Sequence, residues 1–203
     1  MNWSLPESVE VQGVTYSIRT DYRCILDILT DLSDPEADGR DRALAVLIGL
    51  YPDFDDMPPE HYEDAIQAGL NFINCDSGDA PHKAPRLVDW EQDYSLIIAP
   101  INRVIGGEVR AVEYMHWWSF LAAYQEIGDC TFAQVVRIRD HLARGKSLDK
   151  SDREWYRKNR HLVDFKRKYT GADDALMKEW GGYVDDLVGD VSSLLDAING
   201  EAA

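Results

Sequence analysis

The chain of 203 residues is poor in cysteine, and its three cysteines, Cys24, Cys75 and Cys130, lie far apart. Secreted scaffolds held by disulfides carry an even set of closely spaced cysteines, and this sequence has neither such a set nor a CxxC pair. Residues 1–6 also have no basic and apolar segment of the kind that forms a secretion signal. We therefore expect free thiols in a reducing compartment.

Long apolar runs are missing as well. The most apolar stretch, MHWWSFLAA at 115–123, is far shorter than the roughly 20 residues that a bilayer requires. Its flanks contain Glu113, His116 and Gln125, whose polar groups are costly in hydrocarbon. These features exclude a transmembrane span here, and we expect no membrane partner.

The known catalytic and metal-binding motifs are absent from the sequence. It contains no HExxH, GxSxG, GxGxxG or P-loop. Glu113 and His116 form a single ExxH, whereas a di-iron bundle needs two such pairs and two further carboxylates. We expect no catalytic residue, no metal and no cofactor, and we predict that the protein is not an enzyme.

Basic charge is scarce at both ends of the chain, although the net charge is −16. Residues 1–102 carry 20 acidic and 6 basic side chains, and residues 171–203 carry 8 acidic and 1 basic. Residues 103–170 carry 14 basic and 9 acidic side chains, with Arg137, Arg139 and Arg144 expected on the basic surface. Acidic ends repel phosphates, so we expect no nucleic acid partner. The uneven charge suits self-association or a basic protein partner.

The stretch around 115–123 is the candidate centre of the fold. Apolar residues surround most of a predicted helix over 109–128, which is typical of a central helix. Neighbouring Trp117 and Trp118 point about 100° apart on a helix. One indole can therefore anchor the core while the other faces a groove or a partner.

The remaining pattern is mostly helical. Alternation about Gln12-Gly13 predicts a β-hairpin over 8–18, which requires support from helices or another sheet. Periodicity and caps predict further helices over 21–32, 41–51, 58–74, 89–105 through Pro100, 131–144 and 151–165. Their expected caps include Asp21 (or Thr20), Asp89, Thr131, and Ser151 with Glu154. A flexible loop is expected at about 75–86.

The acidic C-terminal segment, 171–203, has an apolar seam spaced alternately by three and four residues, as in a heptad repeat. Glycines within it weaken a helix by roughly 1 kcal/mol each, so the helix needs a surface to form against. That surface is either its own domain or a neighbouring subunit or client. The seam consists of Met177, Trp180, Val184, Leu187, Val191, Leu194 and Ile198.

Several segments together resemble a bacteriophage family. They are DWEQD at 89–93 with SLIIAPINRVIG after it, EYMHWWSFLAAY at 113–124, TFAQVVRIR at 131–139 and DREWYRKNRHLV at 152–163. This combination resembles the gene-product-fifteen family of siphophages of Gram-positive bacteria over about residues 8–168. The matching motif positions are Trp90, Asp93, His116, Trp117 and Trp118.

The resemblance implies a non-enzymatic tail-assembly chaperone, encoded next to the tape-measure protein. Such a protein keeps the tape-measure protein soluble, helps to recruit tail-tube subunits, works in the host cytoplasm and is absent from the mature virion. Two alternatives stay open. One is a minor tail or connector component of the virion, and the other is a host-directed protein-binding adaptor.

We therefore predict a mainly α-helical protein with a short N-terminal β-hairpin and an amphipathic C-terminal helix. Residues 1–170 form the helical domain, and residues 171–203 form the acidic arm. The candidate partner-binding residues are Trp117, Trp118 and the seven seam residues of the arm. Assembly into a homo-oligomer remains open.

Overall fold

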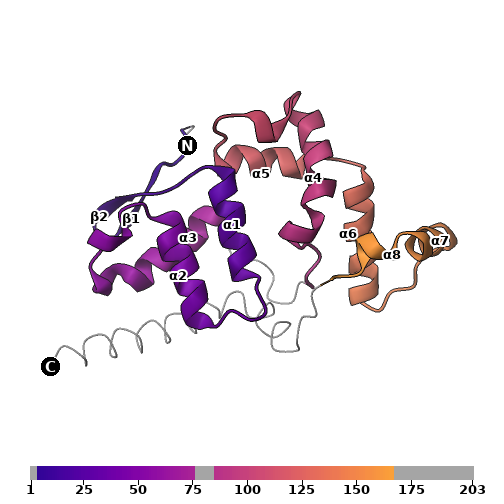
Figure 1. Ribbon diagram of the computed structural model, residues 1–203, viewed down its shortest axis with the longest axis horizontal. Helices are drawn as coiled ribbons and strands as arrows, with labels where there is room; N and C mark the ends of the chain where they lie inside the picture. The colour runs from indigo at the N-terminus through magenta and orange to yellow at the C-terminus, as the bar shows by residue number, and fades with distance from the viewer. Residues whose placement is uncertain (1–3, 76–84, 167–203) are drawn as a thin grey trace. The chain divides into compact units, whose positions relative to one another are not determined.

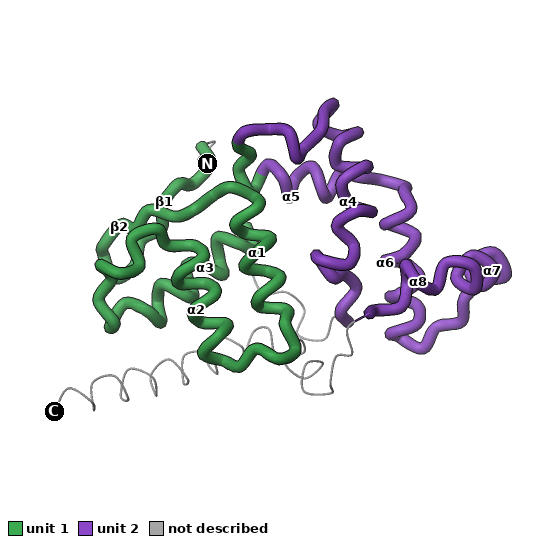
Figure 2. Tube along the Cα trace, in the orientation of Figure 1, with its two compact units in different colours: residues 1–82, 114–118, 179–203 green, residues 83–113, 119–178 purple. Residues whose placement is uncertain are grey.

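The computed structural model describes residues 4–75 and 85–166, and this part of the chain is mainly α-helical with one short β-hairpin (Figure 1). It divides into two compact units (Figure 2). Unit 1 contains residues 4–75 and 114–118, and unit 2 contains residues 85–113 and 119–166. Among these residues no helix is long and apolar enough to cross a membrane. The predicted acidic arm and most of the predicted loop at 75–86 lie outside the described residues.

The predicted hairpin is confirmed in unit 1. Strand β1 (Ser8–Val11) pairs antiparallel with β2 (Val14–Ser17). Gln12 and Gly13 have φ angles of 50° and 80°, which are typical of a two-residue hairpin turn. The Gln12 amide donates to the Glu60 carbonyl and to the Asp64 carboxylate, so the hairpin packs on the residues that begin α3. Its expected dependence on helical support is thus confirmed.

Three helices form the rest of unit 1: α1 (Tyr22–Leu32), α2 (Gly39–Leu50) and α3 (Tyr62–Ile73). Asp21 caps α1 as predicted, and Asp38 with Asp41 forms a capping box at α2. Two 3₁₀ turns, η1 (Phe54–Asp56) and η2 (Pro59–His61), precede α3. The buried apolar side chains of α1 to α3 include Ile25, Ile28, Val46, Leu47, Leu50, Ile66 and Leu70.

Unit 2 is built on α4 (Trp90–Ile105), which begins after Asp89 as predicted and continues through Pro100 as one helix. Gly106 ends it in the left-handed conformation, with φ of 73°. Unit 2 also contains most of α5 (Trp117–Gln125) and the helices α6 (Thr131–Ala143), α7 (Lys150–Lys158) and α8 (Arg160–Val163). A core cluster joins α6, α8 and the connection between α6 and α7, and it consists of Val135, Ile138, Leu148 and Val163.

The long central helix predicted over 109–128 is wrong in its first half. Residues Val109–Ala111 form a single 3₁₀ turn, η3, and helix α5 covers only Trp117–Gln125. Met115 and His116 are extended because this segment exchanges backbone hydrogen bonds with the residues around Asp21, at the start of α1. The Tyr22 N–H donates to the Met115 carbonyl at 3.0 Å, and the Trp117 N–H donates to the Thr20 carbonyl at 2.7 Å.

Two predicted caps are also wrong. Cys130 caps α6 through its Sγ, which accepts from the Ala133 N–H at 3.4 Å. Asp149 caps α7 by accepting from the Asp152 N–H at 2.7 Å, so the predicted pair Ser151 and Glu154 lies inside the helix. The helix predicted to reach 165 breaks at Asn159, and α8 follows. For both caps, a residue one or two positions upstream of the predicted one provides the acceptor.

Candidate functional site

The buried ring of His116 fixes where α5 begins. Its Nδ1 accepts a hydrogen bond from the Trp118 backbone N–H at 3.0 Å. A neutral imidazole that accepts at Nδ1 carries its proton on Nε2, and Nε2 lies 2.9 Å from the Pro6 carbonyl oxygen. His116 thus caps α5 and anchors the segment that leads into β1.

Trp117 and Trp118 both use their indole N–H groups within unit 1. Trp117 donates to the Ile73 carbonyl at 2.7 Å, and Trp118 donates to the Phe72 carbonyl at 2.9 Å. Both acceptors belong to the last turn of α3, whose carbonyls have no partner within the helix. Trp117 is 2% exposed, whereas Trp118 is half-buried and stacks on Phe72. The two indoles therefore cap α3, and only Trp118 keeps part of its ring on the surface.

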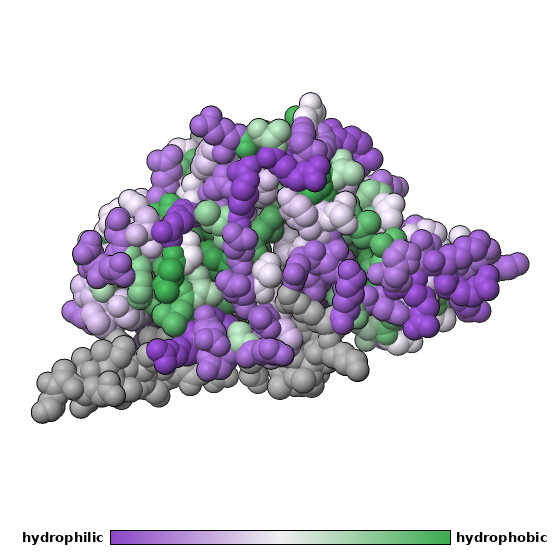
Figure 3. All heavy atoms as spheres, in the orientation of Figure 1, coloured by the Kyte–Doolittle hydropathy of each residue, from purple (hydrophilic) through white to green (hydrophobic). Residues whose placement is uncertain are grey.

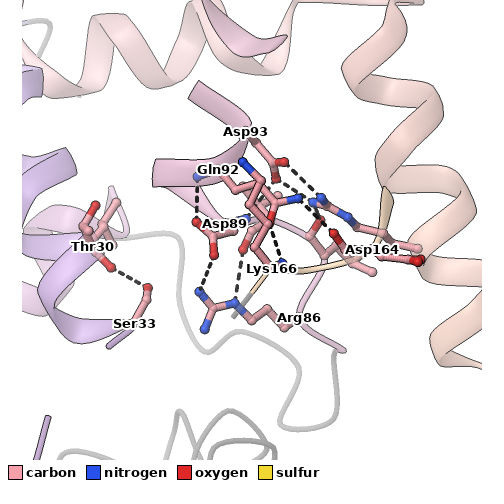
Figure 4. A network of polar contacts seen from close by, with 12 residues as sticks. Thr30, Ser33, Arg86, Asp89, Gln92, Asp93, Asp164 and Lys166 are labelled. Atoms are coloured by element: carbon pink, nitrogen blue, oxygen red, sulfur yellow. Dashed lines mark hydrogen bonds and ion pairs between the residues drawn. The ribbon is translucent and has the colours of Figure 1, made fainter. Parts of the chain in front are cut away.

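The DWEQD segment, residues 89–93, caps a helix and fixes a distant stretch of backbone in unit 2 (Figure 4). The Asp89 carboxylate caps α4 by accepting from the Gln92 N–H at 2.9 Å. The Gln92 side chain donates to the Asp164 carbonyl at 3.1 Å and accepts from the Lys166 N–H at 2.9 Å. Gln92 thus fixes the backbone of 164–166, the last described residues of the chain.

Asp93 forms a buried ion pair with Arg139 from α6. Arg139 donates to both carboxylate oxygens of Asp93, at 2.5 and 3.0 Å. Its remaining N–H groups donate to three backbone carbonyls, and the Phe165 ring lies 4.2 Å from the guanidinium carbon. The three carbonyls are those of Leu87, Leu162 and Val163. All five donors of the guanidinium are therefore used, as a buried charge requires.

The expectation that Arg139 contributes to the basic surface is wrong, because its side chain is only 3% exposed. The sequence contained a signal that Arg139 is buried. Arg139 follows Phe132 and Val135 at helical spacing, which places it on the apolar face of α6. A cation on an apolar face requires a carboxylate partner, and DWEQD supplies it.

Trp90, the remaining motif residue, packs against Tyr124 of α5 with ring centroids 5.3 Å apart. Tyr124 also contacts Phe132, at 5.8 Å. Burial, followed by the negative charges of Asp93 and Cys130, raises the pKa of Tyr124 to about 12. The Trp90 position thus belongs to an aromatic cluster within unit 2.

Unit 1 also contains a surface that sequence reasoning missed, a groove of about 750 Å³ between α1 and α2. We call it the acidic groove. Its acidic lining residues are Asp27, Asp31, Asp34, Glu36 and Asp41, and its apolar ones are Ile28, Ala37, Leu44, Ala45 and Ile48. Asp27 and Asp31, one turn apart on α1, could have indicated an acidic stripe, but only the packing of α1 on α2 places apolar residues beside it.

Within residues 4–75 and 85–166, no group of three or more His, Cys, Asp or Glu side chains is arranged to hold a metal ion. The seven seam residues of the arm, from Met177 to Ile198, lie outside the described residues. Of the predicted partner-binding residues, the structure therefore describes Trp117 and Trp118.

The fold and these clusters define a class: a mainly helical protein with an N-terminal hairpin, whose two sequence motifs are each built into the packing of one unit. The family model described as Bacteriophage Gp15 protein matches residues 1–165. The match covers most of the chain, so the protein belongs to this bacteriophage family and is a phage structural or morphogenesis protein. No curated protein and no solved structure matches the chain.

Proposed function

We propose that this protein is a non-enzymatic tail-assembly chaperone. In the host cytoplasm it binds the tape-measure protein, keeps it soluble and helps to recruit tail-tube subunits. It then leaves the particle and is absent from the mature virion. Membership of the Gp15 family supports a role in building the phage particle.

The observation that carries the proposal is the acidic groove. A chaperone for a long helical client requires apolar surface that remains accessible and enough charge to keep the complex soluble. The groove combines both, because carboxylates line it next to Ile48, which is 53% exposed. The net charge of −16 favours solubility of the loaded complex.

Co-expression tests the proposal. The tape-measure protein of the same phage is expressed with and without this chain, and the soluble fraction is analysed by pull-down and size-exclusion chromatography. We expect a soluble tape-measure protein that co-purifies with this chain and precipitates when this chain is omitted. Mass spectrometry of purified virions should not detect the protein.

An insoluble tape-measure protein in the presence of this chain would contradict the proposal. If the protein were also present in purified virions in stoichiometric amounts, it would be a structural component of the tail. Addition of tail-tube protein to the soluble complex tests recruitment, which predicts a larger assembly that contains all three proteins.

A further inference from the structure

The acidic groove has two chemically different walls. On α1 the stripe Cys24, Asp27, Ile28 and Asp31 faces it, and on α2 the stripe Asp41, Leu44, Ala45 and Ile48 faces it. Each stripe has the spacing i, i+3, i+4, i+7 and therefore spans about two helical turns. Figure 3 shows hydrophilic residues along α1 beside hydrophobic ones over α2. The α1 wall carries two carboxylates, Asp27 and Asp31, and the α2 wall is mainly apolar.

Acidic charge is concentrated at one end of the groove, where the connection between the helices adds Asp34 and Glu36. Burial, followed by the charges of Asp27 and Asp34, raises the pKa of Asp31. At the opposite end, Arg19 donates to the Ile48 and Gly49 carbonyls in the last turn of α2. Among the described lining residues Arg19 is the basic one, and it caps α2 instead of pairing with the carboxylates.

We infer that the acidic groove binds an amphipathic helix of another protein, with an apolar row against α2 and Lys or Arg side chains along the edge that faces α1. The helix would contribute two to three turns, because the facing stripes are about two turns long. Cations at that edge would relieve the repulsion among the carboxylates, and the apolar row would cover Ile48. This inference rests on the proposed function, because we take the helix to belong to the client, the tape-measure protein.

Charge argues against two other occupants. The chain's own arm, 171–203, carries 8 acidic residues and 1 basic residue, so its charge repels the groove. A second copy of the chain is also disfavoured as the occupant. Its basic side chains would come from unit 2, where several already pair with carboxylates of the same unit. These pairs are Arg137–Asp152, Arg144–Asp140, Lys158–Glu154 and Arg160–Asp164.

A synthetic 16-residue helical peptide is the probe, with Leu at the i, i+3, i+4, i+7 positions and Lys at the flanking ones. A second peptide carries Glu in place of every Lys. Binding to the full-length protein is measured by titration calorimetry at low and high salt. We expect the Lys peptide to bind, the Glu peptide not to bind, and the affinity of the Lys peptide to fall as salt rises.

Two variants of the full chain localise the binding. The double variant Asp27→Asn/Asp31→Asn removes charge from the α1 wall, and Ile48→Asp changes the exposed apolar residue of α2. We expect each to weaken binding about tenfold or more. The matched controls are Asp55→Asn/Asp56→Asn, with the same change in net charge on exposed residues of η1, and Leu142→Asp, on an exposed residue of α6. Both should bind within twofold of the unchanged chain.

Equal binding of the two peptides, or equal losses in groove variants and controls, would overturn the inference. Circular dichroism verifies that each variant is folded, and the asparagine pair keeps the test decisive if Ile48→Asp unfolds. Co-expression with the tape-measure protein separates the two proposals. If the Ile48→Asp variant still solubilises the tape-measure protein, the proposal that the groove binds the helix is contradicted and the chaperone proposal is not. If the unchanged chain binds the Lys peptide but does not solubilise the tape-measure protein, the chaperone proposal fails alone.

Discussion

The carboxylate of Asp93 and the guanidinium of Arg139 form a two-pronged ion pair inside unit 2, with side-chain exposures of 0% and 3%. The pair joins α4 to α6, and the guanidinium also binds the backbone around α8. One interaction thus connects the DWEQD segment to two elements more than 40 residues away in the sequence.

Removing one partner of this pair should be strongly destabilising. Asp93→Ala leaves a buried cation without its carboxylate, and such changes cost about 3–5 kcal/mol. We expect urea denaturation to show a loss of that size. Arg144→Ala, which breaks the exposed Arg144–Asp140 pair, should cost less than about 1 kcal/mol. Similar losses in the two variants would contradict the assignment.

The indole of Trp117 should be required as a hydrogen-bond donor as well as for its volume. Trp117→Phe keeps an aromatic ring but leaves the buried Ile73 carbonyl without this donor, which costs about 1–3 kcal/mol in addition to the lost volume. Trp118→Phe should cost less, because that ring is only half-buried and solvent can replace the donor. Thermal denaturation of the two variants measures the difference, and a larger loss for Trp118→Phe would be inconsistent with this geometry.

His116 should be replaceable by a residue that caps a helix. His116→Ala removes the Nδ1 acceptor for the Trp118 N–H and should destabilise the protein by about 1 kcal/mol or more. His116→Asn retains an acceptor near the first turn and should recover part of that loss. Chemical denaturation measures both variants. No difference between them would show that the ring acts through its volume alone.

Tyr51 should make stability depend on alkaline pH. Its buried hydroxyl donates to the Ala65 carbonyl at 2.5 Å, and burial raises the pKa of Tyr51 well above its usual range. Because the folded state disfavours the ionised phenol, this stabilisation is complete below the unfolded pKa of about 10 and is lost as pH rises above it. Tyr51→Phe should lower the free energy of unfolding at pH 7 by about 0.5–1.5 kcal/mol. It should also flatten the decline above about pH 10, and an unchanged decline would contradict the role of Tyr51.

Gly49 should be required for the close packing of α1 on α2. A Cβ at this position would lie 2.6 Å from Cγ1 of Ile28, so Gly49→Ala would force α1 or the Ile28 side chain to move. Such overpacking costs about 1–3 kcal/mol, which exceeds the gain of up to about 1 kcal/mol in helix propensity. Gly107→Ala, where nothing lies within 4 Å of the added Cβ, is the control and should be near neutral. Equal stability of the two variants by denaturant unfolding would exclude close packing at Gly49.

The sequence predicted the hairpin and most helices because these depend on local chemistry. Gln12-Gly13 accepts positive φ angles, Asp21 and Asp89 cap the helices that follow them, and Gly106 ends α4. Each signal lies within a few residues of the boundary that it sets. The predicted start of the central helix failed where a distant partner decides: Thr20 and Tyr22 hold Met115 and His116 extended, although those residues have helical periodicity. The predicted caps of α6 and α7 failed locally, because Cys130 and Asp149 provide the acceptors just upstream of the predicted residues.

The sequence by itself determined the mainly helical class, the hairpin, the distribution of charge and the family to which the chain belongs. Tertiary structure alone decided that His116, Trp117 and Trp118 cap helix ends, that Arg139 is buried against Asp93, and that α1 and α2 form an acidic groove. The physical reason is the range of the interactions. Caps and periodicity act within one or two turns, whereas the acceptors of the two indoles and the carboxylate partner of Arg139 lie 44 to 46 residues away in the sequence and meet them only in the folded chain.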